Sequence, residues 1–149
     1  MIIFKYTSDE YGCFSNFSPH PIVVDGKEWK TTEAWYQAQK FTDANIQEQI
    51  RLKPTPKASK ILAQIGHPSF RIDWDRIRTS VMGQALRYKV DQHPKIREKL
   101  LATGKEEIWE YSTKDFFFFL NPYTGQGENM LGKLWWDLGF EQRINDLRL

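Results

Sequence analysis

Hydrophobic positions along the chain predict a small number of short strands. The apolar stretch from Ile2 to Tyr6 (IIFKY) has the composition of a strand. The segment PIVVDGKEW places two apolar arms around Asp25 and Gly26, a pair that favours the positive dihedrals of a tight hairpin turn. Residues 106–112 (EEIWEYS) also favour an extended backbone. The pattern therefore predicts one hairpin and two further strands.

Helical spacing and helix-end signals account for most of the remaining chain. Thr31 or Thr32 can cap a helix whose first turn carries Glu33. Further helices are predicted over residues 42–53, 57–65, 72–90, from Pro94 to a stop at 103–104, and over 131–144. Strands and helices do not alternate regularly. The predicted fold class is therefore α+β, a mostly helical single domain over residues 1–149.

Composition and charge narrow the function classes. The formal net charge is only +2 and no dense run of Lys or Arg occurs, so electrostatic wrapping of a nucleic acid is not expected, while a local phosphate site stays open. Cys13 is the only cysteine, which excludes an intrachain disulfide and suits a reducing cytoplasm. No signal peptide and no run of about 18 apolar residues is found. We therefore expect a cytoplasmic protein with no membrane partner.

The stretch TTEAWYQAQKF, residues 31–41, carries the main chemical question. At about 100° per residue, four polar side chains share roughly one third of the helix circumference; they are Glu33, Tyr36, Gln37 and Lys40. One interpretation is a solvated polar face with a weak ion pair. The other is a cleft in which a carboxylate, an amide and an amine converge on a ligand, with the lysine as a nucleophile. Spacing permits the second interpretation without requiring it.

Other segments offer weaker signals. Asn16 lies between Phe14 and Phe17, in a loop that either plugs the core or presents the amide to a sugar hydroxyl or a base edge. The glycines of GQGEN precede a predicted helix, where backbone N–H groups can hold a phosphate, although these residues alone favour a plain glycine loop. The three histidines stand far apart, so neither a metal site nor a Ser-His-Asp triad is predicted.

Taken together and in order, these segments resemble the NADAR family, which includes N-glycosidases. The resemblance rests on FSNF, DGKEWKTTEAWYQAQKF, WDRIRTSVM, LLATG, Asp115 and GQGENMLG, and it covers roughly residues 5 to 140. It implies a mostly helical α+β domain that cleaves N-ribosyl bonds without a metal, and no cofactor is expected. Two substrate classes are associated with the family: phosphoribosylamino-pyrimidine intermediates of riboflavin biosynthesis, and ADP-ribose attached to guanine in DNA or RNA.

The resemblance also assigns expected roles to individual residues. Lys40 is expected to be the nucleophile and Glu33 the residue that shuttles protons. Substrate contacts are expected from Asn16, Phe17, Tyr36, Gln37, Lys89, Phe118, Asn121, Gly125, Gly127 and Asn129. Within that set, Lys89 could bind phosphate, and the glycines with Asn129 should shape the phosphate or ribose end of the pocket. Trp74 and Met82 also match the family pattern and are interpreted as packing residues.

One departure from the family pattern affects the substrate. After its acidic residue the family commonly reads an aromatic residue followed by Trp-Gly and often a second acidic residue. Here the chain reads DFFFFLNPYTG, which puts Phe118 at the tryptophan position. Phenylalanine can stack on a base but lacks the indole N–H donor. This change weakens the pyrimidine interpretation, so ADP-ribosylated guanine is slightly favoured, with transient contact to ADP-ribosylated DNA or RNA. A non-catalytic ADP-ribose or nucleotide binding module is the alternative from a different class, and the oligomeric state is left open.

Overall fold

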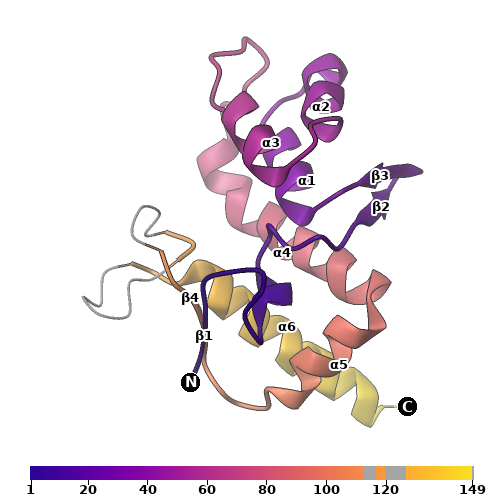
Figure 1. Ribbon diagram of the computed structural model, residues 1–149, viewed down its shortest axis with the longest axis vertical. Helices are drawn as coiled ribbons and strands as arrows, with labels where there is room; N and C mark the ends of the chain where they lie inside the picture. Colours follow the sequence, from indigo (N-terminus) through magenta and orange to yellow (C-terminus); the bar gives the residue numbers. More distant parts are fainter. Residues whose placement is uncertain (113–116, 120–126, 149) are drawn as a thin grey trace. The chain divides into compact units, whose positions relative to one another are not determined.

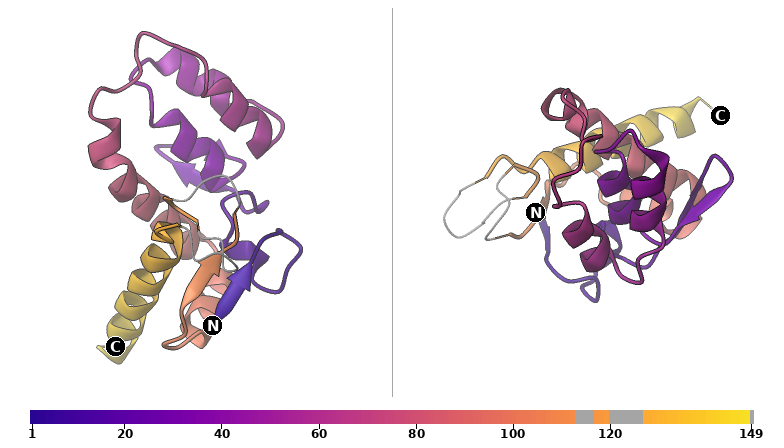
Figure 2. Two further views of the ribbon diagram at one scale, coloured as in Figure 1. Left: turned by 90° about the vertical axis from the view of Figure 1, so that its left-hand side faces the viewer. Right: turned by 90° about the horizontal axis from the view of Figure 1, so that it is seen from above.

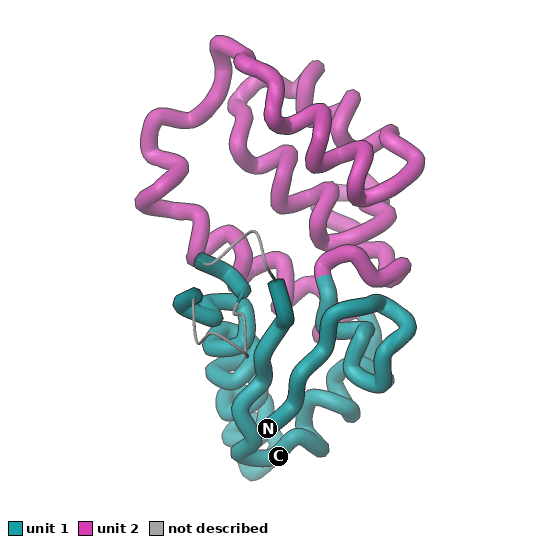
Figure 3. Tube along the Cα trace, turned by 60° about the vertical axis from the view of Figure 1, so that its left-hand side comes forward, with its two compact units in different colours: residues 1–15, 93–149 teal, residues 16–92 magenta. Residues whose placement is uncertain are grey.

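The computed structural model describes residues 1–112, 117–119 and 127–148. The chain separates into two compact units, drawn in different colours in Figure 3. Unit 1 joins Met1–Ser15 to the stretch His93–Leu149, and unit 2 is the uninterrupted segment Asn16–Gln92. The predicted α+β class is confirmed, since helices dominate and the strands are few and short (Figure 1). The extension of a single domain over residues 1–149 stays a prediction.

Unit 2 is a group of helices with one β-hairpin. It contains β2 (Ile22–Val24), β3 (Lys27–Trp29), α1 (Thr32–Ala38), α2 (Ala44–Arg51), α3 (Pro56–Leu62) and α4 (Trp74–Gln92). Helix α1 packs against α2, α3 and α4 and is the centre of this unit. The predicted hairpin is present: β2 and β3 are antiparallel, and Asp25 and Gly26 both have positive φ, as a two-residue turn requires.

The helix starts in unit 2 follow the predicted caps. The Thr31 hydroxyl accepts the N–H of Ala34 at 3.2 Å, and Thr55 caps α3 in the same way, followed by Pro56 in the first turn. Helix α3 is shorter than predicted and ends at Leu62, because the next amides bond three residues back and tighten the chain into turns. Sequence signals thus locate the helices better than their ends.

Unit 1 combines two strands with two helices. They are β1 (Ile2–Phe4), β4 (Ile108–Glu110), α5 (Pro94–Ala102) and α6 (Met130–Leu147), and a short 3₁₀ turn (η1) covers Gly12–Phe14. Figure 2 shows β1 and β4 side by side, where they pair in parallel with Ile3 opposite Trp109. The core of this unit is aromatic: the rings of Phe14 and Trp135 lie 4.7 Å apart, and the Trp135 indole donates to the Phe14 carbonyl at 3.0 Å.

Gly132 fixes how closely α6 approaches β4. A Cβ atom at this position would lie 1.7 Å from the carbonyl oxygen of Ile108, so no other residue fits without moving a backbone. The side chain of Asn129, which precedes the helix, donates to the same carbonyl at 3.1 Å. The segment GENMLG therefore has a packing function in unit 1, independent of any ligand.

Candidate active site

The start of α1 is fixed by the loop that contains Asn16. The Asn16 carbonyl accepts the N–H of Glu33 at 3.2 Å, and its side-chain oxygen accepts the Thr32 hydroxyl at 2.8 Å. The side-chain nitrogen donates to the sulfur of Met82 on α4 at 3.1 Å. Asn16 is buried and links this loop to α1 and to α4. An asparagine suits the position because its side chain both accepts and donates a hydrogen bond. Its predicted substrate contact stays a prediction, as does that of Phe17, which is exposed.

The polar face of α1 is buried, so the interpretation of a solvated face is wrong. Glu33 is 7% exposed and Gln37 3%, and Tyr36 is buried beside them. The Gln37 amide nitrogen donates to the Glu33 carboxylate oxygen Oε1 at 2.7 Å. The opposite face, with Ala34, Trp35 and Ala38, belongs to the hydrophobic core. Burying a carboxylate costs free energy unless it is paired or hydrogen-bonded, so this position calls for an explanation beyond helix stability.

Lys40 does not lie on the helix, which corrects the geometry predicted for it. Helix α1 ends at Ala38, and the amide of Lys40 bonds to the carbonyl of Gln37, three residues back. The backbone then leaves the helix because Phe41 forms an antiparallel bridge with Phe70. The Lys40 carbonyl accepts the N–H of Arg71 at 2.8 Å. A neighbouring segment, and not helical periodicity, therefore sets the position of Lys40.

The ammonium group of Lys40 lies against two aromatic rings. It is 5.9 Å from the ring centroid of Tyr36 and 5.9 Å from that of Trp74, and the two rings are 5.2 Å apart. These distances are within the range of cation–π attraction. Trp74, interpreted from sequence as a packing residue, is buried and also forms a wall beside this amine. No spacing rule connects Trp74 to Lys40, because the link depends on the bridge between Phe41 and Phe70.

An ion pair stabilises the turn that leads into Trp74. The Arg71 guanidinium donates to both carboxylate oxygens of Asp73, each at 3.0 Å. This hydrogen bonding lowers the pKa of Asp73 and raises that of Arg71. Since the amide of Arg71 also holds the Lys40 carbonyl, the pair supports the turn that carries both Lys40 and Trp74.

Lys89 is fully buried on α4. Its exposed fraction is 0%, and its ammonium donates to the hydroxyl of Ser18 at 2.6 Å. Ser18 is itself buried and lies 2.9 Å from Nδ1 of His20. Lys89 therefore connects α4 to the loop that follows Asn16. Its predicted phosphate contact stays a prediction, and Ser18 is a residue of this network that the sequence did not single out.

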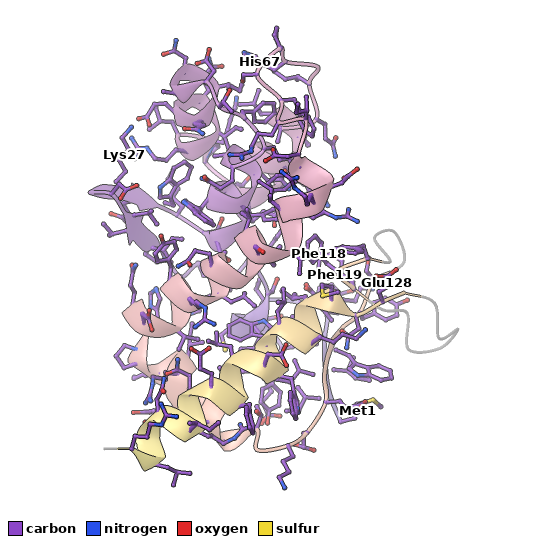
Figure 4. All side chains as sticks on the ribbon, turned by 180° about the vertical axis from the view of Figure 1, so that it is seen from behind. Met1, Lys27, His67, Phe118, Phe119 and Glu128 are labelled. Carbon is purple, nitrogen blue, oxygen red and sulfur yellow. The ribbon has the colours of Figure 1, made fainter. Side chains whose placement is uncertain are left out.

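Three of the contacts predicted in unit 1, Phe118, Gly127 and Asn129, are described, and they lie near the start of α6. Figure 4 labels Phe118, Phe119 and Glu128 beside the first turn of this helix. The amides of Met130 and Leu131 donate to the carbonyls of Phe117 and Phe118 at 3.0 and 2.9 Å. A phosphate cannot use these two N–H groups while the turn is in place, and the role expected of Gly127 at the phosphate or ribose end stays a prediction. Phe118 is buried, in agreement with a core or wall position.

A cavity of about 500 Å³ adjoins this part of unit 1. Its lining includes Gly127 and Asn129, with the indoles of Trp109 and Trp136. Asn121 and Gly125, also predicted as contacts, lie outside the described residues. Within residues 1–112, 117–119 and 127–148, no three His, Cys, Asp or Glu side chains gather in a way that could hold a metal ion. In the same ranges no helix has the length and apolar character needed to cross a membrane.

Unit 2 supplies three chemical functions, from α1, from the residues just after it and from the start of α4. Glu33 offers a carboxylate that can accept or return a proton, and Lys40 offers an amine. Tyr36 and Trp74 offer aromatic surface beside that amine. This set suits a reaction at a carbon that becomes electrophilic, with proton transfer to a departing group.

Comparison with known proteins supports the same family as the sequence motifs. The model of the NADAR domain matches residues 3–138. The N-glycosidase YbiA of Escherichia coli is 39% identical over 138 residues, which cover 93% of this chain and 86% of that protein. The N-glycosidase Npun_R5314 of Nostoc punctiforme is 41% identical over 135 residues, with 89% and 86% covered.

Two further similarities bear on the fold and on the substrate. The NMR structure of the E. coli protein YbiA matches with a TM-score of 0.90 and 38% identity, over 99% of this chain and 88% of that one. The riboflavin biosynthesis protein VVA0006 of Vibrio vulnificus is 37% identical over 134 residues, 89% of this chain but 36% of that protein. The prediction of an N-glycosidase is confirmed at the level of the family. This chain belongs to the NADAR domain family.

Proposed function

We propose that this protein hydrolyses the N-ribosyl bond between ribose C1 and an exocyclic amine of a nucleobase or related heterocycle. ADP-ribose attached to guanine in DNA or RNA is the substrate we favour, in a cytoplasmic setting. The observation that carries the proposal is the buried pair of Glu33 and Gln37, on the helix that leads directly to Lys40 and its aromatic walls. N-glycosidase relatives that span most of this chain support it.

The chemistry of the linkage suggests one role for Lys40 and one for Glu33 in the reaction. A ribose bonded to an exocyclic amine is a glycosylamine, whose ring can open to an imine at C1. A neutral Lys40 amine adds to C1, and the bond from C1 to the base amine then breaks. Glu33 supplies the proton that the departing amine needs and accepts one from water in the next step. Water hydrolyses the resulting Schiff base, which releases the sugar and restores the lysine.

Direct hydrolysis is the rival route at the same site. In that route Glu33 activates a water molecule, and Lys40 only holds a ribose hydroxyl or a phosphate. Both routes break the same bond and give the same products. They differ in whether a covalent adduct between Lys40 and the sugar forms during turnover.

The second candidate substrate class is the phosphoribosylamino-pyrimidines. What favours it is the similarity of this chain to a segment of proteins named for riboflavin biosynthesis, one from Vibrio vulnificus and one from Zea mays. These compounds carry the same bond between C1 and an amine, so Glu33 and Lys40 could act on them by the same steps. What opposes it is Phe118, which lacks the indole donor of the family pattern.

A product assay with both substrates tests the proposal. Purified protein is offered an ADP-ribosylated guanine oligonucleotide and a phosphoribosylamino-pyrimidine in parallel reactions, and the released base and sugar are separated by chromatography. We expect multiple turnovers on at least one substrate, with faster release from the oligonucleotide. Binding at one equivalent without release would instead indicate a non-catalytic ADP-ribose or nucleotide binding module.

A further inference from the structure

Gln37 carries a buried oxygen that no described residue satisfies. Its amide nitrogen donates to Glu33, but its side-chain oxygen Oε1 is fully buried and has no hydrogen-bond partner among the described parts of the chain. Leaving a buried acceptor unpaired costs about 1–3 kcal/mol. A methionine or leucine at this position would fill similar space without that cost. The glutamine therefore has a function that the stability of α1 does not explain.

The neighbouring carboxylate determines how this amide is turned. In the step in which Glu33 is ionised and accepts a proton, its carboxylate can only accept hydrogen bonds, and the side of the amide that faces it at 2.7 Å is the NH₂ group. If the amide were rotated by half a turn, its oxygen would lie against the carboxylate oxygen. The same contact that holds Glu33 thus forces Oε1 to remain an acceptor without a donor.

We propose that Gln37 is a positioning residue for Glu33, and that α1 keeps this buried amide, despite its unpaired oxygen, for its N–H donor. The inference rests on the proposed function. The amide fixes the carboxylate in one rotamer through the i, i+4 contact within α1.

The position of Gln37 in the helix supports a role through Glu33. The next glutamine in the chain, Gln39, follows the last residue of α1 and donates its amide nitrogen to the Trp35 carbonyl at 3.1 Å. That contact is a side-chain bond to a backbone carbonyl at the end of the helix. The two glutamines therefore form a matched pair, of which only Gln37 contacts the reactive carboxylate.

Two variants of Gln37 separate positioning from packing. Gln37→Met keeps an unbranched side chain of similar length but has neither donor nor strong acceptor. We expect kcat to fall about tenfold to hundredfold, because a misplaced catalytic group costs rate at this scale. KM should change less than threefold, roughly, since the interaction matters mainly in the transition state. The Tm should change little, because removal of the unpaired buried acceptor offsets the loss of the hydrogen bond to the Glu33 carboxylate.

Gln37→Glu provides the second variant and Gln39→Met the control. Gln37→Glu has the same shape but sets a second carboxyl group against Glu33, and the two then share a proton. Glu33 no longer exchanges its proton independently, so kcat should fall again, whereas Gln39→Met should retain wild-type kcat. A Gln37→Met protein with wild-type kcat, or one whose loss of rate is matched by a fall in Tm, would overturn the inference. Should Gln37→Met not fold, wild-type kcat in Gln37→Glu would have the same meaning. If the wild-type protein turns over neither substrate, the proposed function fails and not this inference alone.

Discussion

Helix α1 and the start of α6 were both predicted to contact the substrate, and the structure builds them by different means. At α1 the polar side chains themselves are buried and held in place, with Gln37 bonded to Glu33. At α6 the hydrogen-bond donors are backbone amides. The amides of Met130 and Leu131 already donate to carbonyls of the turn at residues 117–119. One helix holds reactive groups, while the other uses its donors to hold a neighbouring turn.

The difference shows which unsatisfied groups point to function. A helix start without capping partners could suggest an anion site, but at α6 the chain supplies partners of its own. A buried carboxylate beside an amide with an unpaired oxygen has no comparable structural explanation. This contrast supports our proposal that the chemistry takes place at α1 and at Lys40, which follows it. The turn of residues 117–119 is assigned the role of placing Phe118.

The largest expected effect is at Lys40. Under the Schiff-base route, Lys40→Ala should reduce turnover on the order of 10³-fold or more, because the nucleophile is lost. Borohydride added during turnover should trap a sugar adduct on Lys40 of the wild-type protein, detectable by peptide mass spectrometry. The exposed residue Lys30 provides the control, and Lys30→Ala should retain both turnover and adduct. Active turnover with no adduct on Lys40 would favour direct hydrolysis.

A second prediction separates structure from binding at Lys89. Because this ammonium is fully buried and bonded to Ser18, Lys89→Met should lower the free energy of unfolding by about 2–3 kcal/mol. If its role is structural, KM should stay within about threefold of the wild-type value at temperatures where the variant is folded. Denaturant unfolding and steady-state kinetics measure the two quantities. A large rise in KM with unchanged stability would instead support the predicted phosphate contact.

A third prediction concerns Phe118 and the choice of substrate. Phe118→Trp introduces an indole N–H, and one hydrogen bond of about 0.5–1.5 kcal/mol corresponds to a twofold to tenfold change, roughly, in kcat/KM. We expect the ratio to shift toward the phosphoribosylamino-pyrimidine, measured with both substrates in one reaction. Phe117→Trp, which changes the adjacent ring, should leave the ratio unchanged. An equal shift in both variants would argue that Phe118 does not select the substrate.

The smallest expected effect is an acid dependence of stability at Glu48 on α2. Hydrogen bonding from Arg51 lowers the pKa of Glu48 from 4.5 to about 2. A lowered carboxyl pKa stabilises the fold above pH 4.5 and loses that contribution as pH falls from 4.5 toward 2. Thermal melts across this range should show a smaller decline for Glu48→Gln than for the wild type. Parallel declines would show that this ion pair does not contribute.

Local features of the fold were predictable, and distant pairings were not. The hairpin turn at Asp25 and the cap at Thr31 depend only on neighbouring residues. Short stretches of sequence are therefore enough to predict them. The parallel pairing of β1 with β4 joins residues more than one hundred positions apart, and no periodicity encodes it. The approach of α6 to that strand depends on Gly132, whose importance shows only once Ile108 lies beside it.

The candidate site was predicted in part, for the same reason. Glu33 and Gln37 lie one helical turn apart, so spacing placed them together correctly, although it did not show that they are buried. Lys40 was extrapolated along a helix that ends at Ala38. Its position, and the presence of Trp74 beside it, depend on the bridge between Phe41 and Phe70, which is a tertiary contact.

The most direct test of the assignment to α1 is the turnover number of Glu33→Gln beside that of Glu28→Gln. The two changes remove the same charge from the same unit, but Glu33 is buried on α1 while Glu28 is exposed on β3. We predict that Glu33→Gln lowers kcat about 10²-fold to 10⁴-fold, as expected for the loss of a general acid–base group. Glu28→Gln should keep wild-type kcat. If Glu33→Gln is folded and turns over substrate at the wild-type rate, α1 is not the reaction site.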